Sequence, residues 1–235
     1  MNRLQLLLLP GLLCDTIVWR GQCRDLAAQA DVHVADYRDC DSIEAMAERV
    51  LAAAPPIFAV AGHSMGGRVA LELQRVAGHR IRAIALMDTA TGPRAEGEEA
   101  KRMRLVDLAL ESGMAAVARE WLPPMLHPSR HADESFMAEL RAMVQRFTPA
   151  QFAGQIRALL NRPDATPVLA TISCPALVLC GRQDAWRSPE QHQEMARKIR
   201  GATFVMVEDC GHMAPVERPD QVTAAMRHLL DIAAG

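Results

Sequence analysis

Short apolar runs alternate along this chain with longer segments whose hydrophobic positions recur every three or four residues. The runs predict buried strands, and the segments between them predict amphipathic helices. The strands are almost continuously apolar, which is typical of parallel strands covered by helices on both faces. We therefore predict an α/β fold with a mainly parallel sheet of about six strands, over Leu4–Leu9, Val32–Asp36, Ile57–Ala61, Ile81–Met87, Ala176–Cys180 and Thr203–Val207.

Helix starts are marked by capping boxes, in which a short polar side chain is followed three residues later by Glu or Gln. The boxes at Ser188–Gln191 and Thr148–Gln151 also place proline at the first helical position, which favours a helix there. Asp41 with Glu44 predicts a further helix, with Asp41 as its cap. The final helix should run over Pro219–Ala233.

The alternation stops between the fourth and fifth predicted strands. Residues 91–170 contain a helical pattern punctuated by glycines and prolines, and no convincing strand. We expect an inserted helical cap of about four helices here. The predicted organisation is a core made of residues 1–90 and 171–235, with the cap at 91–170.

Composition narrows the choice of partners. The chain has 235 residues, of which 50% are hydrophobic and 23% charged, with a formal net charge of -2. So much apolar surface predicts a folded globular protein, and the weakly acidic balance argues against nucleic acid as a partner. We expect a small-molecule substrate and a monomer or homodimer.

The first residues resemble a secretory signal but fail in detail. Pro10-Gly11 interrupts the apolar run Leu4–Leu9, and no stretch approaches the length of a membrane span. The six cysteines are scattered without a C-x-x-C pair, so no zinc or redox motif is present. We therefore expect a cytoplasmic protein with reduced thiols, not bound to a membrane.

The most informative motif is a G-x-S-x-G segment formed by Gly62, His63, Ser64, Met65 and Gly66. It follows a predicted strand and precedes a predicted helix, which is the context of a nucleophile elbow. The elbow glycines Gly62 and Gly66 allow the strand and helix to approach closely. The sharp turn predicts Ser64 as a nucleophile lifted above the sheet.

A serine hydroxyl needs a base within hydrogen-bond reach and a third group to orient that base. His212 follows the last predicted strand and is the candidate base. Asp184 lies four residues beyond the strand Ala176–Cys180 and is the favoured acid. Asp88, at the end of an earlier strand, stays open as an alternative. The predicted catalytic residues are therefore Ser64, Asp184 and His212.

Two main-chain amides are candidates for an oxyanion hole. The amide of Met65 lies at the start of the helix after the elbow, where the helix dipole favours negative charge. The amide of Leu12 lies in the loop after the first strand, next to Gly11. No metal site is predicted, because Pro128 breaks the helix that would align His127 and His131.

Together these motifs resemble the α/β-hydrolase superfamily over nearly the whole chain, at residues 9–15 (LPGLLCD), 62–67 (GHSMGG), 181–184 (GRQD) and 211–219 (GHMAPVERP). The chain is most similar to small bacterial carboxylesterases, alongside pimeloyl-carrier esterases and cofactor-free haloperoxidase-like members. It departs from them at Pro10, where many members have histidine. It also lacks the first two family strands, so the resemblance implies the all-parallel sheet order 4-3-5-6-7-8 in family labels.

The resemblance implies a serine hydrolase that cleaves a carboxylic ester of a small or medium acyl group through an acyl-enzyme, without a cofactor. Thioester or acyl-carrier ester hydrolysis, carbon–carbon bond hydrolysis and perhydrolysis stay open, as does a receptor with negligible turnover. Residues 91–165 hold ten basic and ten acidic residues, so the cap has no overall bias toward an acidic carrier. Arg141, Arg146 and Arg157 form either a local basic patch or a solvated helix face.

Overall fold

The computed structural model describes residues 3–234. Six parallel strands form one sheet in the order β2-β1-β3-β4-β5-β6, which is the order that the resemblance implied. The strands are β1 (Leu4–Leu9), β2 (Ala30–Val34), β3 (Phe58–His63), β4 (Ile81–Met87), β5 (Ala176–Gly181) and β6 (Thr203–Val207). The predicted fold class and strand number are therefore confirmed.

The bounds of β2 and β3 were predicted wrongly, and β5 ends one residue later than predicted, at Gly181. β2 begins at Ala30, which pairs with Leu4, and ends at Val34. It is an edge strand, so it accommodates the polar Asp31, which the prediction had left outside the strand. β3 continues to His63, because main-chain pairing does not require apolar side chains.

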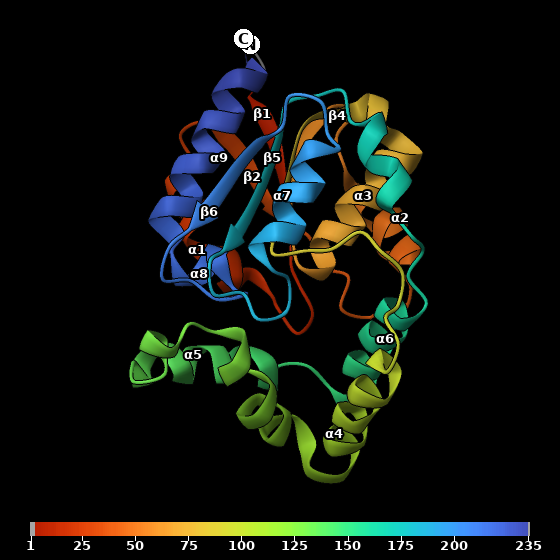
Figure 1. The fold of residues 1–235 in the computed structure, drawn as a ribbon, viewed down its shortest axis with the longest axis vertical. Coiled ribbons are helices and arrows are strands. Elements are labelled where there is room, and N and C mark those ends of the chain that lie inside the picture. The colour runs from red at the N-terminus through yellow and green to blue at the C-terminus, as the bar shows by residue number, and fades with distance from the viewer. Residues whose placement is uncertain (1–2, 235) are drawn as a thin grey trace.

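Helices cover both faces of the sheet (Figure 1). On one face α1 (Arg20–Asp25) packs against α9 (Pro219–Ala234), and on the other lie α2 (Ile43–Ala53), α3 (Met65–Ala77) and α7 (Pro189–Arg197). The shorter helices are η1 (Thr16–Trp19), η2 (Gly78–Arg80), η3 (Pro123–Met125), η4 (Pro128–Arg130), η5 (Thr166–Thr171) and α8 (Ala214–Glu217). This two-sided cover explains why the central strands are almost entirely apolar.

The predicted caps were mostly correct. Ser188 and Thr148 each form a complete capping box with the glutamine three residues later. The prediction of Asp41 as a cap was wrong, because Ser42 caps α2 and accepts a hydrogen bond from the amide of Ala45. Because the Ser42 hydroxyl accepts the capping hydrogen bond, the carboxylate of Asp41 is free to form an ion pair with Arg157.

Between β4 and β5 the chain forms α4 (Glu98–Trp121), α5 (Glu134–Gln145) and α6 (Pro149–Leu160). We call residues 91–170 the helical insertion. Gly113 interrupts α4 with a φ of 75°, which only glycine adopts freely. Helices α4, α5 and α6 of the insertion lie at the end of the sheet opposite the chain termini (Figure 1). Within residues 3–234, no helix has the length and apolar character needed to cross a membrane.

Candidate active site

Ser64 lies at a sharp turn between β3 and α3. Its backbone has φ 54° and ψ -113°, a region that residues other than glycine rarely adopt. Such strain persists only where the surroundings hold it in place. Here the amide of Ser64 donates to the carbonyl of Met87 on β4, 2.8 Å away, and its carbonyl accepts a hydrogen bond from the Thr89 hydroxyl.

The two glycines beside Ser64 allow the elbow to pack closely. A methyl group added to Gly62 would overlap the carbonyl of Gly66 and lie 2.6 Å from the amide nitrogen of Gly67. A methyl group on Gly66 would overlap the carbonyl of Leu9, at the end of β1. The start of α3 therefore touches the loop that carries Leu12.

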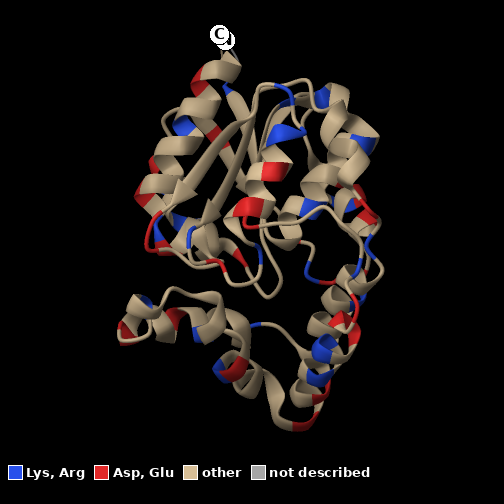
Figure 2. Cartoon of the chain, viewed as in Figure 1, with Lys and Arg blue, Asp and Glu red and all other residues tan. Residues whose placement is uncertain are grey.

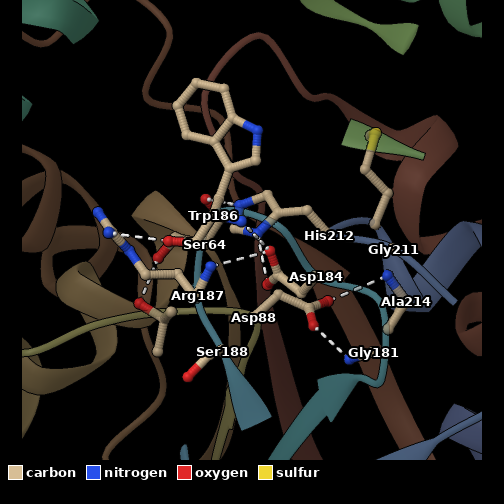
Figure 3. A network of polar contacts seen from close by, with 12 residues as sticks. Ser64, Asp88, Gly181, Asp184, Trp186, Arg187, Ser188, Gly211, His212 and Ala214 are labelled. Atoms are coloured by element: carbon tan, nitrogen blue, oxygen red, sulfur yellow. Dashed lines mark hydrogen bonds and ion pairs between the residues drawn. The ribbon is translucent and has the colours of Figure 1, made fainter. Parts of the chain in front are cut away.

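Three side chains from the carboxyl ends of separate strands meet above the sheet (Figure 3). The hydroxyl of Ser64 donates to Nε2 of His212 over 2.9 Å. Nδ1 of His212 donates to Oδ2 of Asp184 over 2.7 Å. The structure thus brings the three predicted catalytic residues into one hydrogen-bonded chain, and the Asp184 bond fixes the His212 tautomer that accepts from Ser64.

Asp184 is held in its charged form. Its Oδ1 accepts hydrogen bonds from the amides of Trp186 and Arg187, at 2.8 and 3.0 Å. Burial acts to raise the pKa of this carboxyl, but attraction to His212 and these hydrogen bonds lower it below the usual value. Asp184 is therefore suited to stabilise a protonated imidazole.

Asp88, the alternative acid, lies elsewhere in the network. Its two oxygens accept hydrogen bonds from the amides of Gly181 and Ala214, each at 3.0 Å (Figure 3). Burial and repulsion from Asp184 raise its pKa well above the usual value. Asp88 therefore links the loops that carry Asp184 and His212. The carboxylate that contacts the His212 ring is Asp184.

His63 contacts the main chain of His212. Its Nε2 donates to the carbonyl oxygen of His212 over 2.8 Å. Burial and the proximity of His212 lower the pKa of His63 to about 3, so the ring is neutral near neutral pH. The His63 ring therefore holds the His212 backbone without adding a charge beside it.

Glu217 was not singled out by the sequence reasoning. Its buried Oε1 accepts from the amides of Gly211 and Met213, at 3.0 and 3.2 Å, and its Oε2 accepts from the amide of His127 at 2.8 Å. The amide of His212 donates to the carbonyl of Met125 over 2.7 Å. These bonds join the loop that carries His212 to the helical insertion. The sequence signal that could have identified Glu217 is a glutamate directly after the apolar run Met213–Val216, five residues beyond His212.

Two adjoining cavities lie over the serine. The smaller, of about 40 Å³, is lined by both candidate oxyanion residues, Leu12 and Met65, together with Ser64 and His212. The larger, of about 400 Å³, is lined largely by the helical insertion. The cavities share the lining residues Leu12, Arg102, Trp121, Trp186 and Arg187. Ser64 therefore lines the smaller cavity, and the larger cavity adjoins it through these shared residues.

The insertion's outer charges are largely paired, and acidic and basic residues are interspersed over its helices (Figure 2). Arg141 pairs with Glu134, Arg146 with Asp15 and Arg157 with Asp41. The three arginines therefore do not form an uncompensated basic patch. Within residues 3–234, no three His, Cys, Asp or Glu side chains gather as a metal site requires.

Comparison with known proteins decides the family. The model of the alpha/beta hydrolase family matches residues 6–225. The chain belongs to the alpha/beta hydrolase family. Among curated members, it is 27% identical to the pimeloyl-[acyl-carrier protein] methyl ester esterase of Nitrosomonas europaea, over 94% of this chain and 93% of the relative.

Solved structures of alpha/beta hydrolases agree closely with this fold. A thermophilic esterase from Thermogutta terrifontis, with malate bound, superimposes with a TM-score of 0.90 at 28% identity, covering 100% of this chain and 92% of that one. The enol-lactonase from Burkholderia xenovorans gives 0.89 at 25% identity, covering 98% and 92%. These similarities support a hydrolase, with esterases among its named relatives.

Proposed function

We propose that this alpha/beta hydrolase is a serine carboxylesterase that cleaves esters of small or medium acyl groups through an acyl-enzyme. The observation that carries the proposal is the hydrogen-bonded chain from Ser64 through His212 to Asp184, which opens onto a cavity. That arrangement supplies a nucleophile, a base and a group that orients the base.

In the acylation step, the hydroxyl oxygen of Ser64 attacks the ester carbonyl carbon while its proton passes to Nε2 of His212. Asp184 stabilises the resulting imidazolium. When the tetrahedral intermediate collapses, the bond to the alcohol oxygen breaks, and His212 returns the proton to that oxygen. The alcohol leaves and the acyl group stays on Ser64.

In the deacylation step, His212 takes a proton from water, whose oxygen attacks the acyl-enzyme. Collapse releases the carboxylic acid and restores the Ser64 hydroxyl. The amides of Leu12 and Met65 stabilise the oxyanion in both steps, and the loss of one such donor typically costs about 3 kcal/mol in the transition state. Every group in this scheme belongs to the chain itself.

The helical insertion acts in this proposal as a cap that sets substrate size. Trp121, Pro124 and Ile156 from the insertion line the larger cavity, and Leu12 and Trp186 close it from the core. A mostly apolar cavity of about 400 Å³ suits a small or medium acyl chain.

Esters on an acyl-carrier protein form a second candidate substrate class. It is favoured by the similarity to the Nitrosomonas europaea esterase. The pairing of Arg141, Arg146 and Arg157 with acidic residues weighs against an acidic carrier docking on these side chains. We therefore place free small-molecule esters first.

The test uses p-nitrophenyl esters of graded acyl length with wild type, Ser64→Ala and a control, Ser112→Ala, on the exposed surface of α4. We expect steady turnover in wild type and the control, and at least about a thousandfold lower kcat in Ser64→Ala. Paraoxon should inactivate wild type and leave a diethylphosphoryl group on Ser64, which peptide mass spectrometry locates.

Equal rates in wild type and Ser64→Ala would remove the nucleophile assignment. A single burst without steady turnover would favour a receptor over an enzyme. If the enzyme turns over only acyl-carrier esters, or only substrates that are cleaved at a carbon–carbon bond, the assignment of the catalytic residues stands and simple esters are rejected as the substrate.

A further inference from the structure

Four arginines from separate parts of the chain gather beside the candidate active site. Arg68 lies on α3, one turn after Ser64, and Arg102 lies on α4. Arg162 follows α6, and Arg187 lies between β5 and α7. Burial, together with repulsion from neighbouring arginines, lowers the pKa values of Arg68, Arg102 and Arg187.

Within residues 3–234, Glu98 is the only carboxylate that forms an ion pair with any of these four arginines. One oxygen of Glu98 accepts from Arg102 Nε and Arg162 Nη1, and the other accepts from Arg162 Nη2, all at 2.7 Å. Asp184, which also attracts Arg187, is bonded to His212. Four arginines and one glutamate give a net charge of +3, and within residues 3–234 Arg68 and Arg187 have no ion-pair partner.

Arg68 and Arg102 are poorly exposed to water, and Arg187 is half-buried. Arg68 is 5% exposed, and the side chain of Arg102 is 11% exposed. Burial, with repulsion from Arg162 and Arg187, lowers the pKa of Arg68 to about 9. Placing like charges together in a poorly solvated site costs free energy unless an anion compensates for it.

The charges lie where a bound substrate must pass. Arg68, Arg102 and Arg187 line the small cavity together with Ser64 and His212. Arg102 and Arg187 also line the larger cavity, so they flank the connection between the two. An ester whose carbonyl lies at Ser64 and whose remaining part fills the larger cavity therefore passes both guanidinium groups.

We propose that Arg102 and Arg187, backed by Arg68, form a subsite for an anionic group on the substrate, so that the enzyme prefers esters that also carry a carboxylate or a phosphate. This inference rests on the proposed esterase function. Guanidinium groups bind planar carboxylate and phosphate oxygens through paired hydrogen bonds, and these bonds are strongest where water is excluded. Bound in this way, the anion compensates the charge excess and orients the ester carbonyl toward Ser64.

The test compares substrates that differ only in the terminal charge. Mono-p-nitrophenyl esters of glutaric, adipic and suberic acid carry a free carboxylate, and the matching methyl p-nitrophenyl diesters are neutral. Release of p-nitrophenolate reports cleavage of the same bond in each pair. For the best chain length, we expect kcat/KM at least about tenfold higher for the acid than for its diester, as a charge-assisted contact implies.

Substitution shows whether the arginines cause this preference. Arg102→Gln and Arg187→Gln should each lower the ratio of kcat/KM for the acid to kcat/KM for the matching diester about tenfold or more. Arg119→Gln, at an exposed position of the same helix as Arg102, is the matched control and should leave this ratio unchanged. Circular dichroism and Tm of each variant check that it is folded.

Inhibition separates the two kinds of anion. Hexanoate, hexyl phosphate and neutral hexanamide compete against a neutral p-nitrophenyl ester in wild type and Arg102→Gln. Stronger inhibition by either anion than by hexanamide, lost in Arg102→Gln, supports the subsite and shows which anion it prefers.

Two results are distinguishable. If wild type hydrolyses the neutral diesters through Ser64 but shows no preference for any acid, or if Arg102→Gln lowers both members of a pair equally, the anionic subsite is rejected and the esterase stands. If Ser64→Ala retains activity toward the neutral diesters, the proposed function itself is rejected.

Discussion

Gly66 offers a direct test of how the elbow is built. In Gly66→Ala, the new methyl group would overlap the Leu9 carbonyl oxygen and lie 2.6 Å from the Leu9 carbonyl carbon and 2.8 Å from the Pro10 oxygen. Ordinary contacts of this kind begin at 3.4 Å, so relieving the overlap with the Leu9 oxygen requires the start of α3 to move away from β1 by more than about 1 Å. These are backbone atoms, which cannot move aside as a flexible side chain does.

The displacement should cost both stability and activity. Overpacking of this size typically costs about 2 kcal/mol, which lowers Tm by about 4–8 °C in a chain of this length. The same movement separates Met65 from Leu12, and a misplacement of about 1 Å in a catalytic site costs about a hundredfold in rate. We therefore expect kcat for p-nitrophenyl butyrate to fall about a hundredfold, with a smaller change in KM.

The matched control is Gly154→Ala, within α6. There the new methyl group would lie 3.5 Å from Cβ of Asp41, an ordinary contact, and alanine favours a helix by about 1 kcal/mol over glycine. Its Tm should be unchanged or higher and its kcat unchanged. Activity of Gly66→Ala within threefold of wild type, with an equal Tm, would refute the reasoning about close approach.

Two further predictions concern Glu217, which is buried, and Glu98, which is half-buried. In Glu217→Gln, the new side-chain NH2 group would face the main-chain amides of Gly211, Met213 or His127 in place of an accepting oxygen. We expect kcat for ester turnover to fall, and the unfolding free energy in urea denaturation to drop by about 1–3 kcal/mol. An unchanged kcat would show that this loop does not affect catalysis. Burial acts to raise the pKa of Glu98, but hydrogen bonds, chiefly from Arg162, lower it to about 2 from 4.5. The stabilisation from the ionised Glu98 is therefore complete above about pH 5 and is lost as pH falls toward 2. After allowance for solvent screening, Glu98→Gln should unfold with a free energy about 1–2 kcal/mol lower than wild type at pH 6. This difference in unfolding free energy, measured by urea denaturation, should narrow at pH 3. A gap independent of pH would contradict the assignment.

The sheet was predictable because its strands are buried on both faces and therefore have a strong apolar pattern. Prediction was weakest where that pattern fades, at the edge strand β2 and at the glycine end of β3. The cap of α2 was misplaced by one residue, because Asp41 and Ser42 are both good caps and only backbone geometry selects between them.

Ser64, Asp184 and His212 were found because each follows a strand, and parallel strands bring their carboxyl ends to one edge of the sheet. Their catalytic roles stay predictions until the variants are measured. The arginines of the proposed subsite have no such local signal. Arg68 was accessible from its spacing to Ser64, but Arg102 and Arg187 meet it only through tertiary packing.

The bonds from Met125 and His127 to the loop around His212 have a consequence for engineering this scaffold. A chimera that exchanges the helical insertion for that of a homologue, in order to alter selectivity, also replaces two of the residues that hold the loop around His212 in place. The insertion of a homologue should therefore be transferred together with that homologue's equivalent of residues 210–217, the loop around His212.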